Sequence, residues 1–326
     1  MNILKKYLPE SVLNILRACR SLLEYSFYCC HEIRKVVYLG ISNREKMLSS
    51  IISTYHVIEK GLTMPERRLG FGKDKVLYLI RLCEEYASCY GDKDEQFLIA
   101  IGVLAEYRNL HLKEGFVLDD EFYAVLNGFI ERFAHIPQIE QHLFTREQYF
   151  ACLQTSFDVF SFSRHSLRHY SGEVELEDLK KAIALAGNAP SACNRQSTRV
   201  KIIVDKEKAR AILEIQNGNR GFGYLADKLI VLTSSVSAWS VRSRNGLYID
   251  GGIFAMNLLY ALHFYKIGAC TLNCYLTPKQ NRRMRKILNL PPFEDIVLLI
   301  AVGGVPDSFA VTASHRSHPD NFTTIL

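Results

Sequence analysis

The sequence has 326 residues, of which 48% are hydrophobic and 23% are charged. This length and composition predict a globular protein with a sizeable core, arranged as two domains or as one large domain with an extension. The net charge of +6 is small and spread along the chain, so no nucleic-acid partner is expected. No run of about 18 uncharged apolar residues is present, so no transmembrane segment is expected.

The N-terminal stretch, residues 1–23, mixes basic and apolar side chains. It has no clean apolar run that ends at a small-residue cleavage site, so it is not expected to be a signal peptide. An ordinary amphipathic helix is the favoured interpretation. A helix that lies on a membrane surface is the alternative.

The nine cysteines are an odd number in a long chain, and no two of them have CxxC spacing. This pattern favours reduced thiols and a cytoplasmic location over a disulfide framework. A zinc site could be drawn from Cys270, Cys274, His315 and His318, but its spacing is loose. No metal site is therefore expected.

Residues 1–150 are expected to form a helical extension or domain. Apolar residues recur at helical spacing over 75–91, 95–112 and 119–136. The segment 55–75 is rich in glycine, proline and charge, and is expected to be an exposed connection between helices. Its charged residues either contact an anionic substrate or partner, or form a solvated loop: Glu59, Lys60, Arg67, Arg68 and Lys73.

Residues 151–326 have a different texture, in which strands alternate with helices. Apolar runs predict strands at 200–205, 228–235 and 295–306. Helical patterns separate them at 206–216, 251–268 and 277–290, the last opening with Thr277 as a helix cap and Pro278 in the first turn. The expected fold class is α+β, with a mixed sheet covered by helices and a mostly helical region before it.

Two short elements carry the candidate chemistry. In RHSLR (164–168), an extended backbone would project Arg164, Ser166 and Arg168 to one face, where two guanidinium groups and a hydroxyl suit a phosphate. In NAPSACNRQ (188–196), Pro190 and small residues permit an irregular backbone that approaches a flat ligand closely. Ser191, Asn194 and Gln196 add donors and acceptors that suit a pyrimidine-like ring edge. Taken singly, an exposed strand edge is the favoured interpretation of the first element and a polar loop that of the second.

Together, and in this order before a strand, the two elements resemble those of the nitroreductase family of flavin enzymes. The resemblance covers residues 161–326. In that family the first element binds the phosphate and ribityl chain of FMN, and the second contacts the flavin ring from the other subunit of a homodimer. The residues that the resemblance assigns to FMN binding are Arg164, His165, Ser166, Arg168, Pro190, Ser191, Asn194, Gln196, Asn219, Thr271, Leu272, Gly303, Gly304 and Arg316.

The resemblance implies an FMN-dependent oxidoreductase that takes hydride from NAD(P)H and passes it, in ping-pong fashion, to a quinone, a nitro compound or a similar small acceptor. The chemistry resides on FMN, so no catalytic side chain is named. Cys193 and Cys270 are expected to be buried, unreactive thiols. The glycines of 218–223 have the wrong spacing for a dinucleotide-binding domain.

Two departures from the family pattern keep alternatives open. Ser197-Thr198 replaces the usual Pro-Trp, and residues 1–150 are absent from minimal family members. One alternative is a specialised oxidase or dehydrogenase that acts on one biosynthetic intermediate. The other is a flavin-binding interaction protein without turnover.

Overall fold

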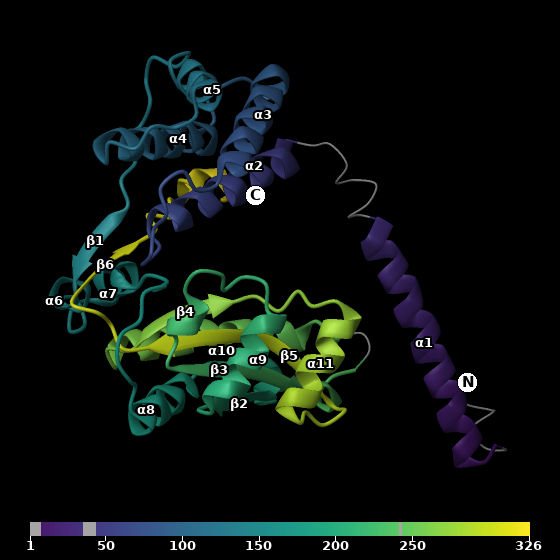
Figure 1. Ribbon diagram of the computed structural model, residues 1–326. Coiled ribbons are helices and arrows are strands. Elements are labelled where there is room, and N and C mark those ends of the chain that lie inside the picture. The colour runs from purple at the N-terminus through teal and green to yellow at the C-terminus, as the bar shows by residue number, and fades with distance from the viewer. Residues whose placement is uncertain (1–7, 35–43, 241–242) are drawn as a thin grey trace.

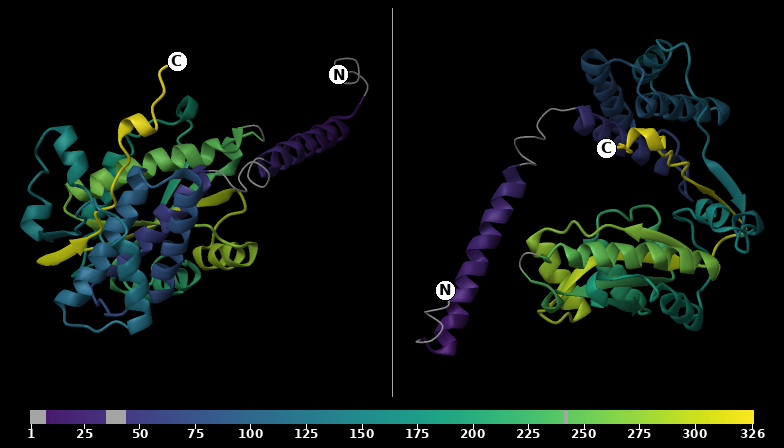
Figure 2. Two further views of the ribbon diagram at one scale, coloured as in Figure 1. Left: turned by 90° about the horizontal axis from the view of Figure 1, so that it is seen from above. Right: turned by 180° about the vertical axis from the view of Figure 1, so that it is seen from behind.

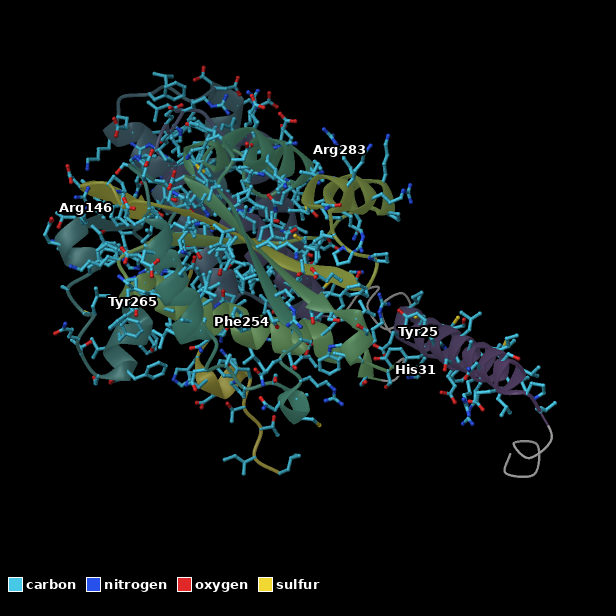
Figure 3. The ribbon with its side chains drawn as sticks, turned by 90° about the horizontal axis from the view of Figure 1, so that it is seen from below. Tyr25, His31, Arg146, Phe254, Tyr265 and Arg283 are labelled. Atoms are coloured by element: carbon cyan, nitrogen blue, oxygen red, sulfur yellow. The ribbon has the colours of Figure 1, made fainter. Side chains whose placement is uncertain are left out.

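The computed structural model describes residues 8–34, 44–240 and 243–326 (Figure 1). Residues 1–7 of the predicted N-terminal helix lie outside the described residues. The remainder of that prediction corresponds to α1 (Glu10–Arg34), which projects away from the rest of the chain in every view (Figures 1 and 2). Tyr25 lies near the end of α1 that is closer to the rest of the chain (Figure 3), and its hydroxyl accepts a hydrogen bond from Arg244. The Tyr28 hydroxyl accepts one from the Asn245 side chain at 3.0 Å.

Four further helices form the N-terminal helical region: α2 (Arg44–Leu62), α3 (Lys73–Tyr90), α4 (Glu95–Lys113) and α5 (Asp120–Ile130). Asp94 and Asp119 cap α4 and α5 by accepting backbone N–H groups through their side chains. The region has its own core, into which α2 projects Ile51, Tyr55, Ile58 and Leu62. Their spacing of three or four residues places them on one helix face.

Two expectations for this region are corrected. Residues 55–62 are helical and belong to α2, so Glu59 and Lys60 do not lie in a loop. Gly61 and Pro65 suggested a loop. The apolar face of α2 packs on α3 and α4, and this packing keeps the segment helical. The helix expected over 119–136 ends at Ile130.

The C-terminal half contains a four-stranded sheet in the order β2 (Thr198–Ile203), β3 (Lys228–Ser235), β5 (Glu294–Gly303), β4 (Gly268–Leu272). The predicted α+β class is confirmed. Each neighbouring pair of strands is antiparallel. Within the described residues the sheet is therefore antiparallel throughout, which corrects the expectation of a mixed sheet. β2 and β4 are its two edges, and β3 is buried along six consecutive residues.

Helices cover both faces of the sheet (Figure 2). Side chains alternate along the central strands: Leu229 and Val231 of β3 face the core shared with α9 (Lys206–Ile215) and α11 (Pro278–Leu288). Ile230 and Leu232 face the core shared with α8 (Leu176–Ala186) and α10 (Gly246–Phe264). The sheet is therefore the middle layer of three.

Among the described residues, α10 is the one helix long and apolar enough to span a membrane by length and composition. Its apolar composition has a structural explanation, because Leu258, Ala261 and Leu262 are buried against the sheet and α8.

A two-stranded sheet and the C-terminal segment connect the two halves. β1 (His142–Thr145) pairs antiparallel with β6 (Ser308–Val311), and two short helices follow β1: α6 (Arg146–Tyr149) and α7 (Phe157–Ser163). Beyond β6, the chain returns to the helical region (Figure 1). There Glu95 accepts hydrogen bonds from the His318 N–H, at 3.1 Å, and from the Asn321 side chain, at 3.0 Å. We continue to propose a division near residue 150.

Candidate functional site

A cavity of about 430 Å³ lies where the helical region meets the β4 edge of the sheet. α2 supplies His56 and Lys60, and the segment before α8 supplies Arg168. β4 and the loop after it supply the stretch Cys270–Tyr275. Its size lies within the range of small-molecule sites.

RHSLR runs beside β4. The Leu167 N–H donates to the Ala269 carbonyl at 2.9 Å, and the Leu167 side chain is fully buried in the core. Arg168, the next residue, instead reaches the cavity, where it also donates to the Thr312 hydroxyl at 3.3 Å. This alternation follows from an extended backbone.

Four cations gather around this edge of the sheet without a carboxylate partner. In the described parts of the chain, no ion pair is formed by Lys60, Arg164, Arg168 or Arg316. The Nε of Arg164 is buried and has no hydrogen-bond partner, which is costly unless a ligand satisfies it. The pKa of Lys60 is lowered, first by burial and then by the positive charge of Arg168. The site therefore favours an anion.

Two imidazoles lie near Arg164, that of the buried His263 and that of the partly buried His165. The Tyr149 hydroxyl donates to the His165 carbonyl at 2.9 Å, and the Ser163 hydroxyl lies 2.9 Å from Nε2 of His263. Burial, followed by Arg164 and His165, lowers the pKa of His263 to about 4. Burial also lowers the pKa of His165. Both rings are therefore neutral near pH 7, and the positive charge beside them is that of Arg164.

The two thiols singled out from the sequence differ. Cys270 is 3% exposed, and burial raises its pKa, so it is a protonated thiol in the wall of the cavity. Cys193 is exposed, which corrects the expectation of a buried thiol. It lies in a loop rather than in a core element.

The NAPSACNRQ loop is irregular, as its composition predicts. Three of its non-glycine residues have positive φ: Cys193 at 51°, Asn194 at 53° and Gln196 at 47°. Internal hydrogen bonds hold this shape, since the Gln196 N–H donates to the Ser191 hydroxyl at 3.0 Å, and the Gln196 amide donates to Asn194 Oδ1 at 3.0 Å. Pro190, Asn194 and Gln196 remain exposed, so their side chains are available to a ligand.

Within one chain, the structure does not bring this loop to RHSLR. The loop is attached to α10 at Asp250, and the start of RHSLR is attached to the same helix at His263. Thirteen residues of α-helix separate those two positions by about 20 Å. The loop also precedes β2, at the sheet edge opposite β4.

The predicted residues of the sheet and its loops, Thr271, Leu272, Gly303, Gly304 and Asn219, fall in three places. Thr271 and Leu272 line the cavity. Gly303 and Gly304 pack closely against Tyr170 and Ser171, and the Ser171 N–H donates to the Gly304 carbonyl at 2.9 Å. These glycines allow the segment that follows RHSLR to approach the sheet.

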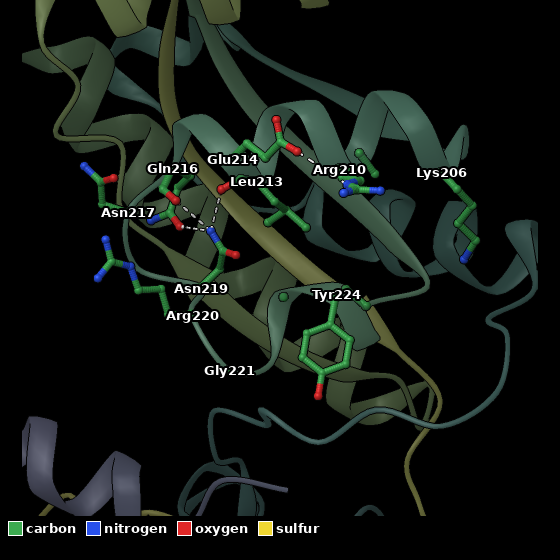
Figure 4. A pocket seen from close by; sticks show the side chains of 13 residues that line it. Lys206, Arg210, Leu213, Glu214, Gln216, Asn217, Asn219, Arg220, Gly221 and Tyr224 are labelled. Atoms are coloured by element: carbon green, nitrogen blue, oxygen red, sulfur yellow. Dashed lines mark hydrogen bonds and ion pairs between the residues drawn. The ribbon is translucent and has the colours of Figure 1, made fainter. Parts of the chain in front are cut away.

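Asn219 lines a different cavity, of about 620 Å³, beside α9 (Figure 4). Its amide donates to the carbonyls of Leu213 and Gln216, at 2.8 and 2.7 Å, and to Oε1 of Gln216 at 2.9 Å. These bonds fix the turn after α9.

In the part of the chain that the structure describes, no three His, Cys, Asp or Glu side chains come together as a metal site.

Several cavity residues were not identified from the sequence, among them His56, Gln216 and Asn273. The Gln216 amide donates to the Asn273 carbonyl at 3.0 Å, which holds the loop after β4. His56 lies one helical turn before Lys60, so a helix assigned over 44–62 would have placed both on one face.

A family model matches the C-terminal half of the chain. The nitroreductase family model matches residues 162–223 and 214–304. The C-terminal half of the chain is nitroreductase-like. Both sequence elements lie within the matched region. The helical residues His56 and Lys60 lie outside it.

Solved structures of nitroreductase-like proteins match about half of the chain. A nitroreductase family protein from Streptococcus pneumoniae is 20% identical, with a TM-score of 0.44, and the match covers 52% of this chain and 100% of that protein. An FMN-dependent nitroreductase from Clostridium difficile is 24% identical, with a TM-score of 0.40, over 44% of this chain and 85% of that one. No curated protein matched the sequence.

Proposed function

We propose that the protein is an FMN-dependent oxidoreductase that uses NAD(P)H to reduce a small organic acceptor. The observation that carries this proposal is the set of arginines without carboxylate partners in the described residues, Arg164, Arg168 and Arg316, close to the β4 edge of the nitroreductase-like half. A phosphate with two negative charges matches such a group. The family match and the FMN-dependent relative lend independent support.

The residues present fit FMN. Arg164 would satisfy its buried, unpartnered Nε by binding the phosphate, and Ser166 and Arg316 are the further residues that we propose to contact it. Arg168, Thr271 and Leu272 line the cavity where the ring would lie. When bound, FMN supplies hydride transfer, with NAD(P)H and the acceptor using the same cleft in turn. The protein's own part is to bind, orient and shield the reactants.

We also propose a homodimer in which the NAPSACNRQ loop of one subunit contacts the ring held by the other. The separation of about 20 Å along α10 supports this arrangement. α10 exposes an apolar stripe at Ile249, Ile253, Met256 and Phe264, whose spacing places them on one helix face. A second copy would cover that stripe. A cytoplasmic location agrees with nine cysteines that are all unpaired.

An absorption spectrum of the purified protein, recorded before and after anaerobic addition of NADH or NADPH, tests the proposal. Flavin bands that bleach are the expected result. Bands that persist would favour a flavin-binding protein without turnover. Failure to bind added FMN would contradict the proposal altogether.

The structure gives one reason to prefer a specialised enzyme over a generalist. Helix α2, outside the family-like half, contributes two side chains to the cavity wall. A broad panel of acceptors reduced at similar rates would argue for the generalist.

A further inference from the structure

The helical region contributes charge to the cavity. His56 and Lys60 lie one turn apart on α2 and both line the cavity, together with Arg168. Arg164 and Arg316 do not line it, so the phosphate-binding candidates and the α2 pair are separate groups. The following inference rests on the proposed function.

His56 is fixed by a buried carboxylate. Its Nδ1 lies 2.9 Å from Oε2 of Glu59, whose side chain is 0% exposed. The other oxygen of Glu59 has no hydrogen-bond partner. Withdrawing a carboxylate from water in this way is expensive, and here it orients the imidazole. Nε2 of His56 has no partner among the described residues, so it is available to a ligand in the cavity.

Lys60 is partly buried and forms no ion pair within the described ranges. It lies close enough to Arg168 for the two charges to repel, an unfavourable arrangement inside a shared cavity. An anionic group between them would remove this repulsion. The two side chains of α2 that line the cavity, His56 and Lys60 (the α2 wall), therefore favour a negatively charged group over a neutral aromatic ring.

We propose that the acceptor carries a carboxylate or a similar anionic group, and that Lys60 and His56 of α2 are the residues that select it. The α2 wall thereby makes the enzyme selective for one charge class of acceptor.

Benzoate and benzamide, nearly equal in shape and different in charge, test this assignment without turnover. Their dissociation constants for the flavin-loaded protein are measured by calorimetry. Benzoate is expected to bind more tightly than benzamide. Lys60→Met is expected to weaken benzoate about tenfold, the size of one charge-assisted hydrogen bond, and to leave benzamide nearly unchanged. His56→Gln should weaken benzoate in the same direction.

Lys93→Met is the matched control, because Lys93 is an exposed lysine of the helical region outside the cavity. It should leave both constants unchanged. The flavin content of every variant is read first from its spectrum, so a loss of flavin is not mistaken for a loss of anion binding.

Turnover of 4-nitrobenzoate and 4-nitrobenzamide gives a second reading. In Lys60→Met the KM for the carboxylate should rise, while the KM for the amide and the rate of reduction by NAD(P)H stay constant. Three results would overturn the inference while leaving FMN binding intact. They are no preference for benzoate over benzamide in the wild type, a preference retained in Lys60→Met, and a Lys60→Met variant in which only the rate of reduction by NAD(P)H changes. Absence of flavin from the wild type would instead contradict the proposed function.

Discussion

The backbone N–H of Ala192 donates to both carboxylate oxygens of Asp250, at 3.1 and 3.3 Å. Asp250 is 4% exposed and belongs to α10. This contact ties the strained loop around Cys193 to the helix that supplies the proposed dimer face. Loop position and dimer face are therefore coupled through one side chain.

Asp250→Ala should destabilise the protein by about 1.5–3 kcal/mol, because a charge-assisted hydrogen bond is lost and the Ala192 N–H is left unsatisfied. The free energy of unfolding in urea measures this effect. Asp250→Asn keeps an oxygen acceptor and should cost less. Equal stability of all three proteins would mean that the loop is held by its internal hydrogen bonds alone.

Replacing Arg164 and Arg168 together with alanine should remove two charge-assisted contacts to the FMN phosphate and ring, each on the order of 1.5–3 kcal/mol. Flavin stoichiometry after gel filtration is the measurement. The control is the double variant Arg210→Ala with Arg220→Ala, which removes the same charge from the cavity beside α9. Flavin retained in the first variant and lost in the second would move the site to that cavity.

Stability should fall as the pH falls from about 6.5 to 4. In the unfolded chain His263 takes up a proton near its ordinary pKa of about 6.5. In the folded protein burial holds that pKa to about 4. Between these values the unfolded state binds more protons, so the free energy of unfolding rises with pH, by at most about 3 kcal/mol from this residue.

His263→Gln should flatten this part of the pH dependence, as measured by urea unfolding at several pH values. His165 and His169, whose pKa values are lowered by burial, contribute in the same direction and remain in the variant. His135→Gln removes an exposed imidazole and should leave the slope unchanged. A slope as steep in His263→Gln as in the wild type would refute the assignment.

Gly304→Ala should cost about 2–3 kcal/mol, because the new Cβ would overlap with the Ser171 carbonyl oxygen and force the backbone to move. Flavin binding should weaken as well, since Ser171 continues the segment that carries Arg168. Gly252→Ala is the contrast, because nothing lies within 4 Å of its Cβ, and the helix should gain about 0.5–1 kcal/mol. Thermal unfolding distinguishes the two variants.

Ile249→Asp combined with Ile253→Asp should convert the proposed dimer to a monomer and reduce flavin retention, because charge would replace the apolar stripe of α10. Light scattering after gel filtration measures the mass. Val117→Asp, which alters an apolar side chain that is 83% exposed in the helical region, should change neither property. A wild-type monomer that holds flavin tightly would contradict the dimer.

Local patterns predicted local structure well. β3 matches the apolar run 228–235 at both ends, since a fully buried central strand leaves a continuous signal. α11 begins where Thr277 and Pro278 predict, and Thr277 and Gln280 form a capping box. No helix was predicted over 44–62, and the end of α2 was assigned to a loop because its glycine, the proline after it and the nearby charges resemble a loop in isolation. Only its packing on α3 and α4 makes that turn helical.

The candidate site was less accessible to prediction. Arg168, Thr271 and Leu272 were named from short motifs, and all three line the cavity. His56 belongs to no motif, and more than 100 residues separate it from Arg168. Lys60 was considered as a contact to an anion, but nothing in the sequence joined it to Arg168. The spacing of apolar residues along a helix indicates which of its faces is buried. It does not indicate which distant segment of the chain lies against the opposite face.

The hydrogen bond from His318 to Glu95 joins positions 223 residues apart in the chain. During synthesis, the core of the helical region, which ends at Ile139, is complete well before β6 begins at Ser308. At about 5–20 residues per second, the ribosome needs roughly 8–35 s to cover that interval. Until Gly268–Leu272 is made, Lys60 has no β4 opposite it, and the closing C-terminal segment is made later still. The cavity is therefore assembled late, from an early-folding wall and a late-folding one.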